Sequence, residues 1–310
     1  MSAAVSEKKS DDTMMFCASC GTAEGDDIKL KKCACYLVRY CSVKCQKDHR
    51  PQHKKECKKK VAELHDELLF KQPESSHFGD CPICCLPLPL DDKKSVMMSC
   101  CSKYICNGCN HANKNREAEG RLQHKCPFCR KATPKTMEEC NEQVMKRMEA
   151  NDPDAMRHFG TLRYHEGDYK AAFEYWTKAA ALGDSEAHHR LSFLYGEGLG
   201  VEKDEKMELH HLTEAAIGGH PHARHNLATA EKDNGRYDRA AKHLIIAAKL
   251  GFDASLTNLK ILYEAEYVSK EDFASALRGY QAAIDATKSP QREEAANFYA
   301  EPQVQTLEAL

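Results

Sequence analysis

The hydrophobic pattern is most regular in the second half of the chain. Between residues 152 and 287 an Ala-Ala pair precedes a glycine, at Gly183, Gly219 and Gly251, with spacings of 36 and 32 residues. The larger apolar residues that keep the same register are Phe159, Leu191, Leu227 and Leu259. Small residues at fixed positions let helices approach closely, and glycine takes the left-handed cap at a helix end. A two-helix unit of this length predicts an α-solenoid over 152–287. Its four expected units are 152–183, 184–219, 220–251 and 252–287.

One turn of this repeat is longer than the others. It reads Tyr-Gly-Glu-Gly-Leu-Gly-Val over residues 195–201, with Asp204 behind it. With this turn the array resembles Sel1-like repeats, a subclass of the tetratricopeptide family. No nucleophile–base pairing or phosphate-binding loop is visible in this half, so a groove that binds a protein or peptide is the default interpretation.

Histidines gather in the middle of the predicted solenoid. They are His188, His189, His210, His211, His220, His222 and His225. A metal site is one interpretation, but scattered histidines on solenoid helices favour ordinary packing. Trp176 is expected to pack between helices.

The first half of the chain has little apolar core, but it holds 16 of the 17 cysteines, between Cys17 and Cys129. Most form short pairs, and two thiolates one turn apart can occupy two corners of a tetrahedron around zinc. Residues 1–15 contain no apolar secretory segment, and no run of about 18 apolar residues predicts a membrane span. We therefore expect a cytoplasmic or nuclear chain, in which zinc is favoured over disulfides. Residues 1–15 are expected to be disordered.

Charge divides the chain near residue 150. The formal charge is +6 over residues 1–150 and −8 over residues 151–310. A basic half suggests nucleic-acid binding, but 15 thiolates and four zinc ions would bring it to about −1. Nucleic acid is therefore not the expected partner. The lysine-rich run at 54–60 is expected to be a solvated helix face rather than a phosphate-binding patch.

Eight ligand candidates lie between residues 17 and 57, enough for two tetrahedral sites. They are Cys17, Cys20, Cys33, Cys35, Cys41, Cys45, His53 and Cys57. Too few apolar residues separate them for a self-supporting core, so metal would have to drive folding. Beyond Ser42 the sequence predicts a short helix, and then a second helix that starts near Pro51.

This spacing, with its Tyr-Cys-Ser at 40–42, resembles a MYND-type zinc finger over residues 16–57. The resemblance implies a crossed arrangement of closed sites, which bind peptides or stabilise the fold and do no chemistry. One zinc would be held by Cys17, Cys20, Cys41 and Cys45, and the other by Cys33, Cys35, His53 and Cys57. Two features depart from the family. Only Ala34 separates Cys33 from Cys35, which favours a weaker second site or one that uses a single cysteine of this pair. His49 replaces the usual aromatic residue and is an alternative ligand.

A charged linker helix is expected over 58–79, followed by a second set of eight ligands within 80–131. They are Cys81, Cys84, Cys100, Cys101, Cys106, Cys109, Cys126 and Cys129. Proline follows the first cysteine of both outer pairs and shapes the knuckle. The order, with Cys-Pro-Phe-Cys-Arg at 126–130, resembles an all-cysteine RING finger, because Lys103 stands where the usual histidine ligand would be. Adjacent side chains tend to diverge, so the spacing favours the other six cysteines as ligands over Cys100 and Cys101. Cys85 and His124 remain open as substitutes.

The RING resemblance implies a ubiquitin ligase without a covalent intermediate. Ile83, with the apolar Leu86 and Pro127, would dock a charged ubiquitin-conjugating enzyme. Arg130 would hydrogen-bond that enzyme and ubiquitin, and so hold the thioester for attack by a substrate lysine. The module lacks the tryptophan that many active RING fingers use for this contact. A non-enzymatic zinc-dependent adaptor is the alternative. Both readings imply about four zinc ions, protein partners and no membrane.

The expected fold is therefore mostly α. Small zinc-stapled modules, MYND-like and RING-like, precede an α-solenoid of Sel1-like helix pairs, and a weakly ordered tail covers 288–310. Because solenoid units touch only their neighbours, deleting residues 220–251 is expected to leave the fingers untouched.

Overall fold

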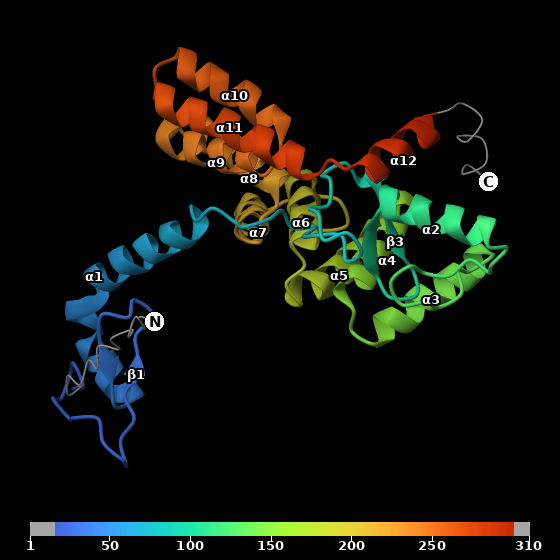
Figure 1. The fold of residues 1–310 in the computed structure, drawn as a ribbon. Coiled ribbons are helices and arrows are strands. Elements are labelled where there is room, and N and C mark those ends of the chain that lie inside the picture. The colour runs from blue at the N-terminus through green and yellow to red at the C-terminus, as the bar shows by residue number, and fades with distance from the viewer. Residues whose placement is uncertain (1–15, 301–310) are drawn as a thin grey trace, which may run out of the picture. The chain divides into compact units, whose positions relative to one another are not determined.

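The computed structural model describes residues 16–300 (Figure 1). The expected disordered segment 1–15 and the end of the expected tail, residues 301–310, lie outside the described residues. The described chain is mostly helical and divides into two compact units after Leu69.

The first unit combines a short hairpin with one long helix. Strands β1 (Lys31–Lys32) and β2 (Arg39–Tyr40) pair antiparallel, and α1 (Val43–Leu69) follows them. The expectation of two helices divided near Pro51 is wrong, because α1 continues through the proline. The expected linker helix over 58–79 is also too long, because α1 ends at Leu69.

A proline inside a helix removes one backbone hydrogen bond and costs about 3 kcal/mol. In α1 the proline lies between Cys45 on one side and His53 and Cys57 on the other. Each of these side chains lies in a cluster with cysteines from outside the helix. The helix is therefore held on both sides of Pro51, which offsets the local cost.

The second unit opens with a small cysteine-rich module. Its elements are η1 (Asp92–Lys94), β3 (Ser95–Met98), β4 (Lys103–Cys106) and α2 (Asn107–Glu119), with β3 and β4 forming an antiparallel hairpin. Ile105 is fully buried, with Leu88 and Met98 beside it, and the rest of the buried cluster consists of cysteines. The cysteine sulfurs thus replace much of the apolar core in this module. Helix α3 (Met137–Glu149) leads from it to the repeats.

The rest of the unit is a stack of helix pairs. They are α4 (Pro153–His165), α5 (Tyr169–Ala181), α6 (Ser185–Glu197), α7 (Glu205–Ile217), α8 (Pro221–Asp233), α9 (Tyr237–Lys249), α10 (Asp253–Glu264) and α11 (Lys270–Ala286). Each helix packs on the next along the array, as expected for a solenoid (Figure 1). The apolar residues that recur in register along the repeat explain this packing, because Leu191, Leu227 and Leu259 are all buried. Trp176 is 1% exposed, which confirms its predicted packing role.

The expected tail is wrong for its first part, because residues 290–300 form helix α12 (Pro290–Ala300). Its first turn has local support. Pro290 suits the start of a helix, and the Ser289 hydroxyl accepts the backbone N–H of Arg292 at 3.2 Å. Helix α12 packs along α2 of the cysteine-rich module (Figure 1).

The segment after Leu69 packs on repeats that are distant in sequence. The Phe70 ring lies 4.8 Å from the ring of His243 in α9, and the backbone N–H of His77 donates to the Gly219 carbonyl at 3.2 Å. The expectation that residues 220–251 touch only neighbouring repeats is therefore wrong. Their deletion would also remove the support of this segment.

Candidate metal centres

The structure brings all sixteen predicted ligands together in four groups of four. Within each group, the candidate ligand atoms all lie within 4.8 Å of one another. The groups are Cys17, Cys20, Cys41 and Cys45; Cys33, Cys35, His53 and Cys57; Cys81, Cys84, Cys106 and Cys109; and Cys100, Cys101, Cys126 and Cys129. The first two have the crossed arrangement that the MYND resemblance implies. The cysteine-rich module repeats this interleaving: its first and third pairs form one group and its second and fourth pairs the other.

The distances within the groups suit tetrahedral zinc. Zinc–sulfur bonds of about 2.3 Å place two sulfur ligands about 3.8 Å apart. The Sγ–Sγ distances are 3.5 Å for Cys20 and Cys41, and 3.8 Å for Cys84 and Cys106. In the mixed group, Cys35 Sγ lies 3.1 Å from His53 Nε2, and a separation below that of two sulfurs is consistent with a zinc–nitrogen bond shorter than a zinc–sulfur bond. All 17 cysteines carry free thiols. The donor sets of all four groups therefore fit zinc.

Four of the cysteine pairs belong to one kind of backbone turn. In each, the first cysteine donates its N–H to the carbonyl five residues later, with N···O distances of 2.8–2.9 Å. The residue after the second cysteine has a positive φ and closes the turn. These residues are Gly21 (73°), Tyr36 (60°), Cys85 (55°) and Arg130 (63°). We call these turns the zinc knuckles.

The knuckle geometry accommodates the one-residue gap between Cys33 and Cys35. The outer hydrogen bond, from the Cys33 N–H to Val38, is kept at 2.9 Å. Only the inner bond changes, because Tyr36 donates to the carbonyl three residues back, while Cys85 and Arg130 donate to the carbonyl four residues back. Both cysteines thus point into the same group, and the missing residue shortens the inner turn alone.

The adjacent Cys100 and Cys101 also converge. They lie in the turn between β3 and β4, where Ser102 has a φ of 56° and donates its N–H to the Met98 carbonyl at 2.8 Å. This tight turn curls the backbone around the site. The Cys100 sulfur is 3.3 Å from Cys129 and the Cys101 sulfur is 3.9 Å from that of Cys126. In an extended strand, neighbouring side chains point to opposite faces. The hairpin turn instead brings both cysteine side chains into one group.

The alternative ligands considered from sequence lie outside the groups. Cys85 is exposed and serves as the last residue of a knuckle. His124 Nδ1 lies 3.3 Å from Glu117 Oε2. His49 Nδ1 is 3.0 Å from the Tyr40 hydroxyl, and its ring stacks on that of His53 at 5.7 Å. His49 thus orients the predicted ligand rather than replacing it.

The crowded thiols of each group cannot all lose their protons without a cation. Burial raises the pKa of Cys109 to about 12, and burial together with the nearby Cys126 sulfur raises the pKa of Cys101 to about 11. The Cys106 thiol donates to Cys81 and lowers the pKa of Cys81 to about 4. A divalent cation would remove this conflict, because it would bind the cysteine sulfurs of a group as thiolates.

A fifth group of possible ligands joins His77, Glu186 and His220. The Nε2 atoms of the two histidines lie 3.2 and 2.8 Å from Glu186 Oε2, and Arg190 Nε lies 2.7 Å from the other carboxylate oxygen. His220 belongs to the clustered histidines of the solenoid. No sequence pattern pointed to His77, because it joins them only through the fold.

His220 and Glu186 are paired without a metal, whereas both ring nitrogens of His77 are buried without a hydrogen-bond partner. His220 Nδ1 accepts the backbone N–H of Ala223 at 3.2 Å, so we infer that its proton is on Nε2 and is donated to Glu186. A metal on Nε2 would move that proton to Nδ1, directly against the Ala223 N–H. Burial opposes ionisation of Glu186, but the hydrogen bond from His220 and the nearby His77 ring outweigh burial and hold its pKa well below the usual range. The group fits the packing interpretation of these histidines.

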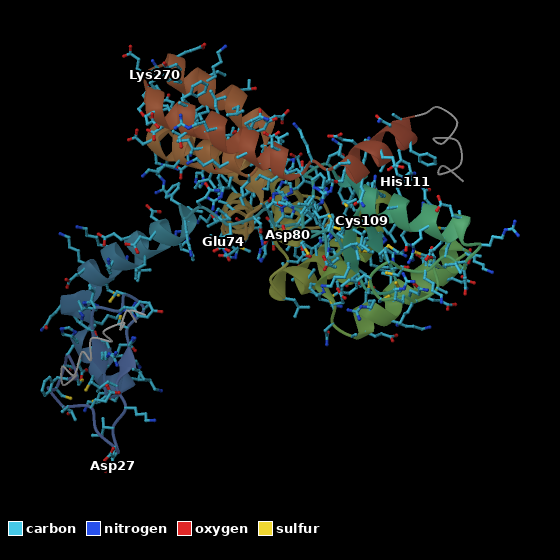
Figure 2. The ribbon with its side chains drawn as sticks, in the orientation of Figure 1. Asp27, Glu74, Asp80, Cys109, His111 and Lys270 are labelled. Carbon is cyan, nitrogen blue, oxygen red and sulfur yellow. The ribbon has the colours of Figure 1, made fainter. Side chains whose placement is uncertain are left out.

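A hollow of about 1300 Å³ lies between the cysteine-rich module and the last repeats. Phe252 and Ile284 line it from the solenoid and Leu90 from the module. Glu74 and Asp80, which are labelled in Figure 2, belong to the same lining. Its apolar walls with charged side chains between them suit a peptide segment better than a small polar molecule.

Two protein-family profiles match the chain. The MYND finger matches residues 17–57, and the Sel1 repeat matches residues 154–184, 185–220 and 222–252. Residues 17–57 are therefore a MYND finger, and residues 154–252 carry three Sel1 repeats close to the predicted units. Neither match covers residues 80–131 or the fourth predicted unit.

Solved structures of repeat proteins are similar to this chain. They include c5321, a protective antigen of uropathogenic Escherichia coli with an SLR fold (21% identity, 55% of this chain, TM-score 0.39), of which the chain spans only 38%. A Sel1 repeat protein from Oxalobacter formigenes has 23% identity over 51% of this chain and 68% of its own, with a TM-score of 0.39. The immunity protein PA5088 from Pseudomonas aeruginosa has 18% identity over 56% of this chain and 82% of its own, with a TM-score of 0.30. No curated protein sequence matches the chain. Among the described helices, none has the length and apolar character needed to cross a lipid bilayer.

Proposed function

We propose that residues 80–131 form a RING-type finger that acts as an E3 ubiquitin ligase. The rest of the chain supports a zinc-binding, protein-interaction role, because it contains a MYND finger and Sel1 repeats. In this proposal the finger docks a charged ubiquitin-conjugating enzyme, while the MYND finger and the repeats recruit protein substrates. The reduced thiols favour the cytoplasm or nucleus as the compartment.

The observation that carries the proposal is the pair of apolar side chains exposed on two zinc knuckles. Ile83 is 41% exposed on the first knuckle of the module, and Phe128 is 45% exposed on the last. Pro127 and Leu86 are partly buried beside them. Apolar groups held outward on rigid turns add nothing to the core, and they suit a docking surface for a protein.

Arg130 has an unusual backbone for an arginine. Its φ is 63°, a left-handed conformation that costs a non-glycine residue roughly 1–2 kcal/mol. Its N–H donates to the Cys126 carbonyl at 2.9 Å, which fixes the backbone, and its side chain is exposed. Glycine would satisfy the turn more easily, so the arginine is better explained by what its guanidinium can bind.

The chemistry proposed for this module is positioning. The amine of a substrate lysine attacks the thioester between ubiquitin and the conjugating enzyme. The carbon–nitrogen bond forms as the carbon–sulfur bond breaks, and the amine proton passes to the departing thiolate. Arg130 donates hydrogen bonds to the enzyme and ubiquitin and so holds the thioester in an attack-ready geometry. The module supplies no nucleophile, because its zinc groups have four protein ligands each and no open position.

The test is autoubiquitination of the zinc-loaded full chain with a panel of conjugating enzymes. Arg130→Ala should lower the rate of chain formation by about tenfold, or about 1.4 kcal/mol of transition-state stabilisation, without loss of zinc. Arg121→Ala is the matched control, because Arg121 is also exposed and left-handed (φ 47°) but lies outside the knuckles. Cys126→Ser should unfold the module and abolish transfer.

Two outcomes would count against the ligase. If no enzyme of the panel gives ubiquitin chains, the module is a zinc-dependent adaptor without activity. If chains form but Arg130→Ala and Arg121→Ala behave alike, the transfer does not use a RING mechanism.

A further inference from the structure

One arginine from the end of the chain reaches into the cysteine-rich module. The Arg292 guanidinium donates to the carbonyls of Pro87 at 2.7 Å and Leu86 at 3.1 Å, and to Cys84 Sγ at 3.4 Å. It also donates to the Thr287 carbonyl at 2.8 Å, at the end of α11. Cys84 and Leu86 belong to the zinc knuckle that begins at Cys81, and Pro87 follows this knuckle directly.

Helix α12 is built to deliver this side chain. Gly108, at the start of α2, leaves room for it, since a Cβ there would lie 2.9 Å from the backbone nitrogen and Cγ of Arg292. Ala295 is fully buried. The Phe298 ring lies 4.6 Å from the ring of His111, one turn along α2. Cys109 and His111, labelled in Figure 2, mark this stretch of α2.

We propose that α12 completes the zinc centre of Cys81, Cys84, Cys106 and Cys109, and that Arg292 is its positioning residue. A guanidinium presents several N–H donors in a fixed plane, which lets one side chain bind two carbonyls and a sulfur at once. It fixes the knuckle loop, and it donates to a sulfur that would be a zinc ligand. The positive charge also offsets part of the net charge of −2 that four thiolates and one Zn²⁺ carry.

The role of Arg292 has a thermodynamic consequence that works in both directions. If docked α12 raises the zinc affinity of this centre, bound zinc must stabilise the docking of α12 by the same factor. The last helix of the chain is thereby coupled to the metal content of a module about 200 residues earlier in the sequence. This coupling requires zinc in the group and does not depend on ligase activity.

The experiment measures zinc transfer from the zinc-loaded full chain to a chromogenic chelator. Arg292→Ala should speed the release of one of the four zinc ions by about tenfold, the lower end of the range for removal of a group that supports a metal ligand. The rate of zinc release from Arg292→Lys should lie between the rates of Arg292→Ala and wild type. Lysine keeps the positive charge but lacks the planar set of N–H donors. Arg278→Ala is the control, since Arg278 is exposed on α11 and pairs with Glu271. The Arg278→Ala variant should release its four zinc ions at wild-type rates.

A second set of measurements leaves Arg292 unchanged. Ala295→Lys cannot place a charged chain in a fully buried position, so α12 should leave α2 and the same single zinc should be released faster. In the wild-type chain, chelation should raise amide hydrogen exchange within residues 290–300. The inference is overturned if Arg292→Ala releases all its zinc at wild-type rates or accelerates all four ions equally. It is also overturned if residues 290–300 keep their protection after zinc is removed.

Discussion

At the scale of single residues, the zinc knuckles depend on one backbone conformation. The residue after the second cysteine has a positive φ in each, and only Gly21 is a glycine, while Tyr36, Cys85 and Arg130 are not. A side chain at such a position strains the turn, because Cβ approaches the following carbonyl. Metal coordination on the preceding cysteine would hold the strained turn in place.

Gly21 and Gly25 provide a matched test of this point. A Cβ at either position would meet no atom within 4 Å, but only Gly21 has a positive φ, of 73°. Gly21→Ala should therefore cost about 1 kcal/mol through backbone strain alone. That corresponds to about fivefold weaker zinc binding in the Cys17 group, measured by competitive zinc titration. Gly25→Ala should bind zinc as the wild type does, and an equal loss in both variants would contradict the strain argument.

At the scale of elements, the repeats depend on close helix approach. Gly160 on α4 faces Trp176 on α5, and a Cβ there would lie 2.7 Å from the indole ring. The indole is held against α4 at the same edge, since Nε1, one of the two atoms nearest to that Cβ, donates to the Arg157 carbonyl at 3.2 Å. The ring has little room to move away.

Gly160→Ala should therefore destabilise the solenoid by about 1–3 kcal/mol, the usual cost of overpacking. Because Trp176 is the only tryptophan of the chain, its fluorescence reports unfolding of this region directly. Gly196→Ala is the control: the three atoms nearest to its Cβ would all belong to the carboxylate end of Glu208, which can move. That variant should be neutral or slightly more stable, because alanine favours helix. Equal destabilisation by both would show that the indole contact is not the cause.

The buried histidines make the solenoid sensitive to acid. Burial lowers the pKa of His189 to about 4, and its Nδ1 is buried without a hydrogen-bond partner. In the unfolded chain a histidine titrates near 6.5. As the pH falls from 6.5 towards 4, His189 binds a proton in the unfolded state but stays neutral in the folded state. The free energy of unfolding therefore decreases across this pH range.

At pH 5.5 this linkage should cost about 1 kcal/mol from His189 alone relative to pH 7.5. Thermal melting followed by Trp176 fluorescence should show a lower Tm at pH 5.5. His189→Leu should reduce that difference, whereas His165→Gln, at an exposed position, should not change it. A pH dependence that is the same in His189→Leu as in the wild type would exclude His189 as its source.

At the scale of the whole molecule, two kinds of core are joined in one chain. The fingers are held by cysteine groups and the solenoid by alanine and leucine packing. Within the second unit, the cysteine-rich module meets the solenoid at Arg157 on α4, whose Nε lies 2.8 Å from Asp184 Oδ2 and whose guanidinium donates to the Tyr104 hydroxyl of the module at 3.0 Å. The solenoid core itself contains no cysteine ligand.

Zinc removal should unfold the core held by cysteine groups and leave the solenoid core folded. Metal analysis of the purified protein should give close to four zinc ions per chain. Strong chelation should then unfold residues 16–130, while the helical signal and the Trp176 fluorescence of the solenoid persist. A zinc content of two or fewer would contradict four filled groups. A coincident loss of Trp176 fluorescence would show that the solenoid needs the fingers.

The sequence by itself determined the candidate ligands and the repeats. Cysteine pairs at short spacing and alanines at a fixed period are local patterns, because a knuckle or a helix pair is formed by residues close in the chain. Cys17 and Cys20, or Leu191 and Leu227, could therefore be assigned without coordinates. The fold class followed from the same periods.

The tertiary structure decided what depends on distant contacts. The convergence of Cys100 and Cys101 needs the turn between two strands, and His77 meets Glu186 only because the segment after Leu69 crosses the repeats. Arg292 reaches Cys84 because α12 packs on α2. The sequence around each of these residues does not indicate which distant residue it will contact. A hydrogen bond or a buried ion pair depends on position in space, and chain segments separated by many residues acquire that position only when the core between them has formed.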